Sequence, residues 1–172
     1  ATFEHYLVEG GFPDYLKTAN KEVLQQLFKD IVYRDIIVRH SVRKDKVLIS
    51  IALYLISNAG NEFSYTNIKN IFGVGSVNTV MDYISWFEDS YLLFTVPKFS
   101  WSLKSVAISP KKVYVIDTGF GDANSLSFSN DTGRLFENAV YLQLRRTYKD
   151  LYYFREKGEC DFVVKEKNKV TH

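Results

Sequence analysis

The sequence predicts an α+β fold made of three parts, and two kinds of pattern carry this prediction. Apolar residues at three- and four-residue spacing, as over 24–31, are typical of a helix with one buried face. Short runs rich in Tyr, Phe and Val, such as 151–155, are typical of strands. The parts are a helical entry segment (1–45), a segment of three helices followed by two strands (46–116) and a partial α/β module (117–172).

Composition limits the classes of function. Of the 172 residues, 46% are hydrophobic and 24% are charged, as is usual for a globular protein. The 22 Lys and Arg residues exceed the 20 Asp and Glu residues by only two, whereas strong nucleic-acid binders have a clear basic excess. The single cysteine, Cys160, excludes an internal disulfide and a cysteine-rich zinc site. No apolar run is long enough for a membrane span, so we expect no membrane contact and a cytoplasmic location.

The entry segment is expected to be helical. A glycine and proline turn at 10–13 precedes a helix that buries Leu24, Phe28 and Ile31 and extends to Val38. The end of this helix is basic, with Arg34, Arg39, Arg43, Lys44 and Lys46. We interpret this charge run as a solvated helix end, and a patch that contacts phosphates is the alternative.

The segment 46–116 has the order of a winged helix-turn-helix. An apolar helix over 47–59 precedes a short second helix that begins near Ser64, and a glycine turn at 73–75 leads to a third helix capped by Ser76. Strands over 91–96 and 113–116 are expected to pair. The residues expected to face inward on the third helix are Val77, Val80, Met81, Ile84 and Phe87.

In this motif the third helix normally enters the DNA major groove. Its expected exposed residues are Ser76, Asn78, Thr79, Asp82, Tyr83, Ser85, Trp86, Glu88 and Asp89. Three of them are carboxylates, and no Lys or Arg occurs between Lys69 and Lys98, so this surface would repel a phosphate backbone. Asn78 and Thr79 are candidates for contacts with base edges, and Lys98 and Lys104 for contacts with phosphates. We favour packing or partner binding over sequence reading. For Tyr83 and Trp86 the alternatives are an interface and the core, and of these we favour the core.

The module 117–172 contains the candidate chemistry. Asp117 is expected to cap the segment after a strand, and a polar loop covers 122–132. A helix with Glu137 follows, then strands over 151–155 and around Asp161, with a turn at 157–158. Alternation along the last strand predicts that Glu159, Asp161, Val163 and Lys165 share one face, with Cys160, Phe162 and Val164 on the other. A helix carboxylate beside a strand carboxylate can hold a divalent cation.

Five motifs in order extend this interpretation to a family. They are Gly-Gly-Phe-Pro (10–13), Tyr-Arg-Asp-Ile (33–36), Asp-Thr-Gly (117–119), Gly-Arg-Leu-Phe-Glu-Asn (133–138) and Glu-Cys-Asp-Phe (159–162). In this order the chain resembles the domain of unknown function that follows the ATPase domain in many bacterial and archaeal AAA-type ATPases. The resemblance implies an ATP-binding P-loop domain upstream of Ala1, a winged helix and a truncated C-terminal module similar to PD-(D/E)XK nucleases.

The resemblance also implies roles for two carboxylates. Glu137 matches the helix carboxylate of the PD-(D/E)XK pattern, and Asp161 matches its strand aspartate. In that pattern the next strand, expected beyond His172, supplies a second carboxylate and a lysine that complete a Mg²⁺ or Mn²⁺ site. Lys165 is not that lysine, because it lies on the Asp161 strand. The alternative is structural: Glu137 and Asp161 form ion pairs with Arg134, Arg145 or Arg155.

Three hypotheses follow. The chain is an accessory region of an ATPase that binds double-stranded DNA or a protein partner, with no cofactor or catalysis of its own. Alternatively, it is part of a metal-dependent nuclease, or a module for protein interaction or oligomerisation only. Salt dependence separates DNA binding from an apolar protein interface, because phosphate contacts weaken steeply as salt rises.

Overall fold

The computed structural model of the chain describes residues 2–126, 131–156, 158–166 and 169–171. Helices and two three-stranded sheets make up these residues, so the predicted α+β class is confirmed. The elements in chain order are α1 (Phe3–Glu9), α2 (Pro13–Thr18), α3 (Lys21–Asp30), the π-helix η1 (Ile31–Val38), α4 (Asp45–Ser57), β1 (Glu62–Phe63), α5 (Tyr65–Phe72), α6 (Val77–Asp89), β2 (Leu93–Pro97), α7 (Leu103–Ile108), β3 (Lys111–Val115), α8 (Thr118–Asn124), α9 (Thr132–Thr147), β4 (Leu151–Arg155), β5 (Glu159–Glu166) and β6 (Lys169–Thr171).

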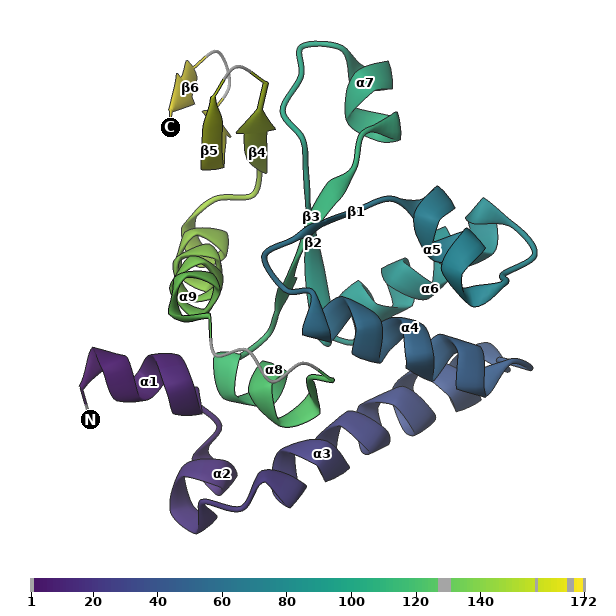
Figure 1. Cartoon of the computed structure of the whole chain (residues 1–172), viewed down its shortest axis with the longest axis vertical. Helices are drawn as coiled ribbons and strands as arrows, with labels where there is room; N and C mark the ends of the chain where they lie inside the picture. The colour runs from purple at the N-terminus through teal and green to yellow at the C-terminus, as the bar shows by residue number, and fades with distance from the viewer. Residues whose placement is uncertain (1, 127–130, 157, 167–168, 172) are drawn as a thin grey trace.

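The first sheet lies near the centre of the molecule (Figure 1). Helices α4, α5 and α6 lie on one side of it, and α9 with the second sheet lies on the other, while α1 to α3 run along one end. Among the described residues, no helix has both the length and the apolar character needed to cross a membrane.

The entry segment is helical, as predicted. Gly10 ends α1 with a φ of 73°, and Pro13 begins α2. The following helix buries Leu24 and Phe28 and then continues as η1. A π-helix forms its hydrogen bonds over five residues and so shifts the buried face relative to an α-helix. The helix extends to Val38, as predicted, and Val38 itself is 71% exposed.

Residues 46–116 form the predicted three helices and pair of strands. β2 and β3 are antiparallel, with Leu93 opposite Val115, and the sheet order is β1-β3-β2. Neither the two-residue strand β1 nor the helix α7 between β2 and β3 was predicted. On α6, Tyr83 is buried, as expected of a core residue. Met81 was predicted to face inward, but it is 46% exposed, because it lies one position after the buried Val80 and so points away from the buried face.

Strand β3 is shared by two hydrophobic cores. Val113 and Val115 point to the core formed with the helices α3 to α6. Tyr114 points the other way, into a second core with Tyr141 of α9 and Tyr153 of β4. This division follows from the alternation of side chains along a strand. It places the residues at even positions of β3 against the C-terminal part of the chain.

The C-terminal helix and strands also occur where the sequence predicts them. β4 pairs with β5 through Tyr152–Val163 and Phe154–Cys160, so β5 contains one extra residue, a β-bulge. Despite the bulge, Phe162 and Val164 pack in the second core while Glu159 and Asp161 both contact Lys112, as the predicted alternation requires.

Two boundaries differ from the predictions. The strand after β5 was expected beyond His172, but β6 pairs with β5 through Lys165–Val170 and therefore begins within the chain. The loop predicted from Asp122 begins later, because α8 continues to Asn124. Residues 127–130 of that loop and Lys157 of the predicted turn lie outside the described residues.

Asp117 caps α8, as predicted, and also joins this helix to the N-terminal turn. Its side chain accepts hydrogen bonds from the backbone N–H groups of Phe120 (2.9 Å) and Gly11 (2.7 Å). A Cβ atom at Gly119 would lie 2.0 Å from the carbonyl oxygen of Glu9. The motifs at 10–13 and 117–119 are therefore two sides of one structural contact.

Candidate functional site: a buried lysine among carboxylates

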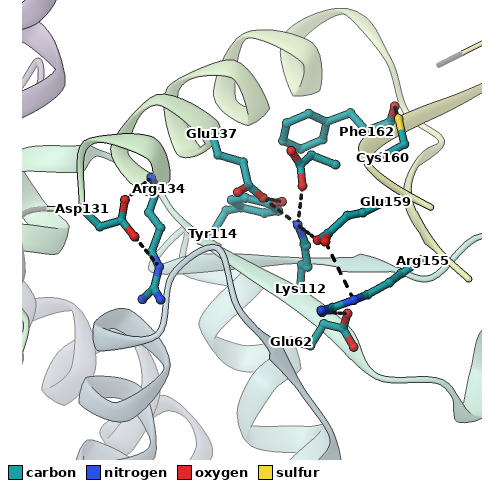
Figure 2. A network of polar contacts seen from close by, with 11 residues as sticks. Glu62, Lys112, Tyr114, Asp131, Arg134, Glu137, Arg155, Glu159, Cys160 and Phe162 are labelled. Atoms are coloured by element: carbon teal, nitrogen blue, oxygen red, sulfur yellow. Dashed lines mark hydrogen bonds and ion pairs between the residues drawn. The ribbon is translucent and has the colours of Figure 1, made fainter. Parts of the chain in front are cut away.

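Lys112, in the middle of the first sheet, lies at the centre of a group of carboxylates. Its side chain is 4% exposed, although lysine is rarely buried unless it is paired. The Nζ atom donates hydrogen bonds to Asp161 (2.7 Å) and Glu137 (3.0 Å), and lies 3.7 Å from Glu159. Figure 2 shows the ammonium group between Glu137 and Glu159. The two predicted site carboxylates are thus brought to the same cation.

The group extends in two directions from Lys112. The Tyr114 hydroxyl donates a hydrogen bond of 2.6 Å to the Glu137 oxygen that also accepts from Lys112. Toward the surface, Arg155 lies 2.9 Å from Glu62 and 3.9 Å from Glu159 (Figure 2). We call these residues the Lys112 cluster; they are Glu62, Lys112, Tyr114, Glu137, Arg155, Glu159 and Asp161. Four carboxylates against two cations give the cluster a formal charge of minus two.

The cluster favours the protonated forms of its two inner residues. Burial disfavours the ammonium form of Lys112, but the hydrogen bonds that it donates to Asp161 and Glu137 outweigh this cost, and its pKa is raised. Burial also raises the pKa of Tyr114, and the hydrogen bond to Glu137 raises it further. Lys112 therefore acts as a permanent cation at neutral pH.

Helix α9 is positioned by local contacts around Glu137. Asp131 caps the helix by accepting from the backbone N–H of Gly133. The next residue after Glu137, Asn138, is 2% exposed and makes two hydrogen bonds to the backbone of Val115: its Oδ1 accepts from the N–H (2.9 Å) and its Nδ2 donates to the carbonyl (3.0 Å). β1 pairs only with Lys111 and Lys112 of β3, and the Asn138 side chain bonds to the same strand farther along, at Val115. These bonds hold α9 against β3 and so position Glu137 beside Lys112 and Tyr114.

The carboxylates are not arranged to hold a divalent cation. A Mg²⁺ or Ca²⁺ ion needs several oxygen ligands at about 2.0–2.6 Å, and here the Lys112 ammonium lies between Glu137 and Asp161. Within the part of the chain that the structure describes, no group of three or more His, Cys, Asp or Glu side chains could hold a metal ion. The residues in this arrangement do not fit Mg²⁺ or Mn²⁺, and a metal role for Glu137 and Asp161 stays a prediction.

The predicted structural alternative named the wrong cation. Arg134 pairs with Asp131, Arg145 lies over the ring of Phe94, and Arg155 pairs with Glu62. None of these three is the direct partner of Glu137 or Asp161. Sequence reasoning missed Lys112 and Tyr114, although one signal was present: both lie at even positions of a strand whose odd positions, Val113 and Val115, are apolar.

The predicted nucleic-acid contacts lie on α6 and in the connection between β2 and β3. Asn78 is exposed on the first turn of α6, whereas Thr79 is half-buried and its N–H donates to the capping Ser76. Lys98 follows β2, and Lys104 is exposed on α7. Of the three carboxylates expected to be exposed on α6, Glu88 is held inside the molecule's own hydrogen bonds: it accepts from the N–H and the hydroxyl of Thr95.

Comparison with known proteins places the chain in a family. A family model described as a domain of unknown function (DUF8612) matches residues 1–131. The chain belongs to this family. It is also 35% identical, over 175 residues, to the uncharacterized protein MJ1544 of Methanocaldococcus jannaschii. That match covers 93% of this chain but 38% of the archaeal protein, and no solved structure matches the chain. The expected link to an AAA-type ATPase domain stays a prediction.

Proposed function

We propose that this chain is an accessory region of a longer protein and that it binds double-stranded DNA through the connection between β2 and β3, without catalysis of its own. We call residues 98–110 of this connection the wing. The observation that carries the proposal is the charge of the wing: residues 98–110 contain Lys98 and Lys104 and no carboxylate.

The order of elements supports a winged-helix assignment. From α4 to β3 the chain forms a helix, a short strand, two helices and two strands, and α7 lies in the connection between these two strands. The short strand pairs with β3 at the edge opposite β2. A glycine with a φ of 62°, Gly73, ends α5 before the turn to α6. In such motifs both the third helix and the wing can contact DNA. Here Asp82 and Asp89 are exposed on α6, so the wing is the favoured contact.

The Lys112 cluster supports a structural role for Glu137 and Asp161. Both form ion pairs with Lys112, a side chain from another part of the same chain. The net negative charge of the cluster would also repel a phosphate backbone on that face. The cluster therefore favours a binding module whose acidic residues hold α9 and β5 against β3.

Titration of duplex DNA at several salt concentrations tests the proposal. Replacing Lys98 and Lys104 together by Ala should weaken binding and lower the slope of log K against log salt by about two. The matched control is the replacement of Lys17 and Lys29, which are exposed on α2 and α3, by Ala. Unchanged binding after the wing substitutions, or an equal loss in the control, would refute wing contact. Binding that is insensitive to salt would instead indicate an apolar protein partner.

The proposed longer protein is an AAA-type ATPase. Support comes from the five motifs and from the relative, most of whose length lies outside the match. ATP hydrolysis by a full-length member of the family, abolished when its nucleotide-binding lysine is replaced, would support this assignment. A full-length protein that neither binds nor hydrolyses ATP would refute it.

A second candidate function is that of a metal-dependent nuclease of the PD-(D/E)XK type. One observation favours it: a helix carboxylate, Glu137, and a strand carboxylate, Asp161, converge on one point. Supercoiled DNA should be incubated with a protein extended past His172 in Mg²⁺ or Mn²⁺, beside Glu137→Ala and Asp161→Ala. Cleavage that both substitutions abolish would establish the nuclease, and its absence with all proteins folded would leave the carboxylates structural.

A further inference from the structure

The wing exposes large apolar side chains that no other part of the described chain covers. Trp101 is 79% exposed, Leu103 85% and Ile108 73%. Figure 1 shows α7 at the far end of the β2–β3 connection, projecting beyond the sheet. Apolar side chains gathered at one exposed place mark an interaction site more often than scattered ones do.

The wing is held in place at both ends by one residue. The N–H of Phe99 donates a hydrogen bond of 2.7 Å to the carbonyl of Tyr153, and the Tyr153 hydroxyl donates one of 2.8 Å to the carbonyl of Pro110. The Phe99 ring also packs edge-on against Tyr152 at 5.7 Å. The wing is therefore a fixed platform, although its apolar residues lie in solvent.

Trp101 contacts Phe99, one of the residues that hold the wing in place. Its ring meets the ring of Phe99 at 5.2 Å between centroids and at 77°, so one edge contact positions the indole. The following residue, Ser102, caps α7 by accepting from the N–H of Ser105. Most of the Trp101 surface is exposed, and Lys98 and Lys104 lie three residues before and after it.

We propose that Trp101 stacks on an unpaired base at the fork or frayed end of a DNA duplex. The inference rests on the proposed DNA binding and names the form of DNA that the wing prefers. A base presents a flat π-face that an exposed indole can cover, and Lys98 and Lys104 neutralise the phosphates on either side. An uninterrupted duplex offers no such face, because its bases are stacked on one another.

The charge of the wing argues for this ligand over other apolar partners. Because the wing contains Lys98 and Lys104 and no carboxylate, an anionic partner is favoured. A membrane surface is a weaker match, since α7 has six residues and can bury little area in lipid. Nucleic acid supplies both the negative charge and the aromatic surface.

The test uses two DNA forms of equal length, one a blunt duplex and one with an unpaired fork. The reporter protein carries Trp86→Phe, so that Trp101 is its single tryptophan. Forked DNA should quench this fluorescence and bind more tightly than the blunt duplex. Trp101→Ala should weaken fork binding by about tenfold while leaving duplex binding unchanged. Trp101→Phe should restore most of the preference, and Leu103→Ala, an equally exposed apolar residue, should leave it intact.

The outcomes separate the two proposals. Equal binding of both DNA forms, unaffected by Trp101→Ala but weakened by the lysine substitutions, would overturn stacking and leave DNA binding in place. No binding of either form would overturn both. Binding to vesicles with anionic lipids that depends on Trp101, without a preference for the fork, would overturn the inference in favour of a lipid surface.

Discussion

Replacing Lys112 by Met tests whether the Lys112 cluster stabilises the fold. Methionine has nearly the length of lysine and no charge, so the substitution removes the cation while filling most of its space. It leaves Glu137, Glu159 and Asp161 without the ammonium that contacts them. We therefore expect a loss of stability much larger than that of an ordinary lysine substitution.

The magnitude follows from how buried each partner is. Removing one member of a buried ion pair costs about 3–5 kcal/mol, because a charge is left buried without a partner. The Glu137 side chain is 18% exposed, whereas Asp161 and Glu159 are 50% and 48% exposed and can be hydrated again. We therefore expect a loss of about 2–3 kcal/mol in the free energy of unfolding, below the full range for a buried pair.

Urea unfolding measures this loss as a shift of the midpoint at constant m-value. The matched control is Lys21→Met: Lys21 forms an ion pair with Asp122 at 2.6 Å, but its side chain is 57% exposed. That substitution should cost below about 1 kcal/mol. Adding Glu137→Gln to Lys112→Met should recover part of the loss, because the unpaired charge is gone. If Lys112→Met costs no more than Lys21→Met, the cluster is not a stabilising feature.

Three further predictions follow from the same contacts. The pKa of the Tyr114 hydroxyl is raised in the folded state, so the neutral hydroxyl stabilises the fold at any pH below the ordinary tyrosine pKa of about 10. As pH rises above about 10 this contribution is lost progressively, and unfolding midpoints should fall, less so in Tyr114→Phe. Gly119→Ala should destabilise the docking of α1, as measured by proteolysis near the N-terminus, whereas Gly75→Ala, in open space, should not. Asn138→Ala should cost about 2 kcal/mol or more and accelerate hydrogen exchange at the Val115 amide, which loses its partner.

Local signals predicted the elements well. The strand predicted over 151–155 is β4, and Ser64, Ser76 and Asp117 cap α5, α6 and α8 as expected. These predictions depend on residues close in sequence, such as a hydroxyl that accepts from an N–H three residues later. The π-helix escaped prediction because the spacing rule assumes a constant period of 3.6 residues.

The site was predicted only in part, because its partners are distant in sequence. Glu137 and Asp161 were found from their places on a helix and a strand, but Lys112 lies 25 and 49 residues away from them. A lysine in a strand is ordinarily a surface residue, and nothing near it in sequence shows that α9 will cover it. The bulge in β5 was not predicted either, because the alternation rule assumes that each residue of β5 pairs with one residue of β4.

Tyr153 connects the Lys112 cluster with the wing. The Lys112 ammonium lies 5.8 Å from the centre of the Tyr153 ring, and the same residue holds both ends of the wing. Tyr153→Phe keeps the ring beside Lys112 and the backbone bond to Phe99. It removes the hydroxyl, which donates to the carbonyl of Pro110 and also interacts with Glu62. If the wing needs both supports to present Trp101, this variant should lose the preference for forked DNA. Because burial raises the pKa of Tyr153, the unfolding midpoints of this variant should also fall less above about pH 10 than those of the unsubstituted chain. A fork preference that survives would show that the backbone bond to Phe99 alone positions the wing.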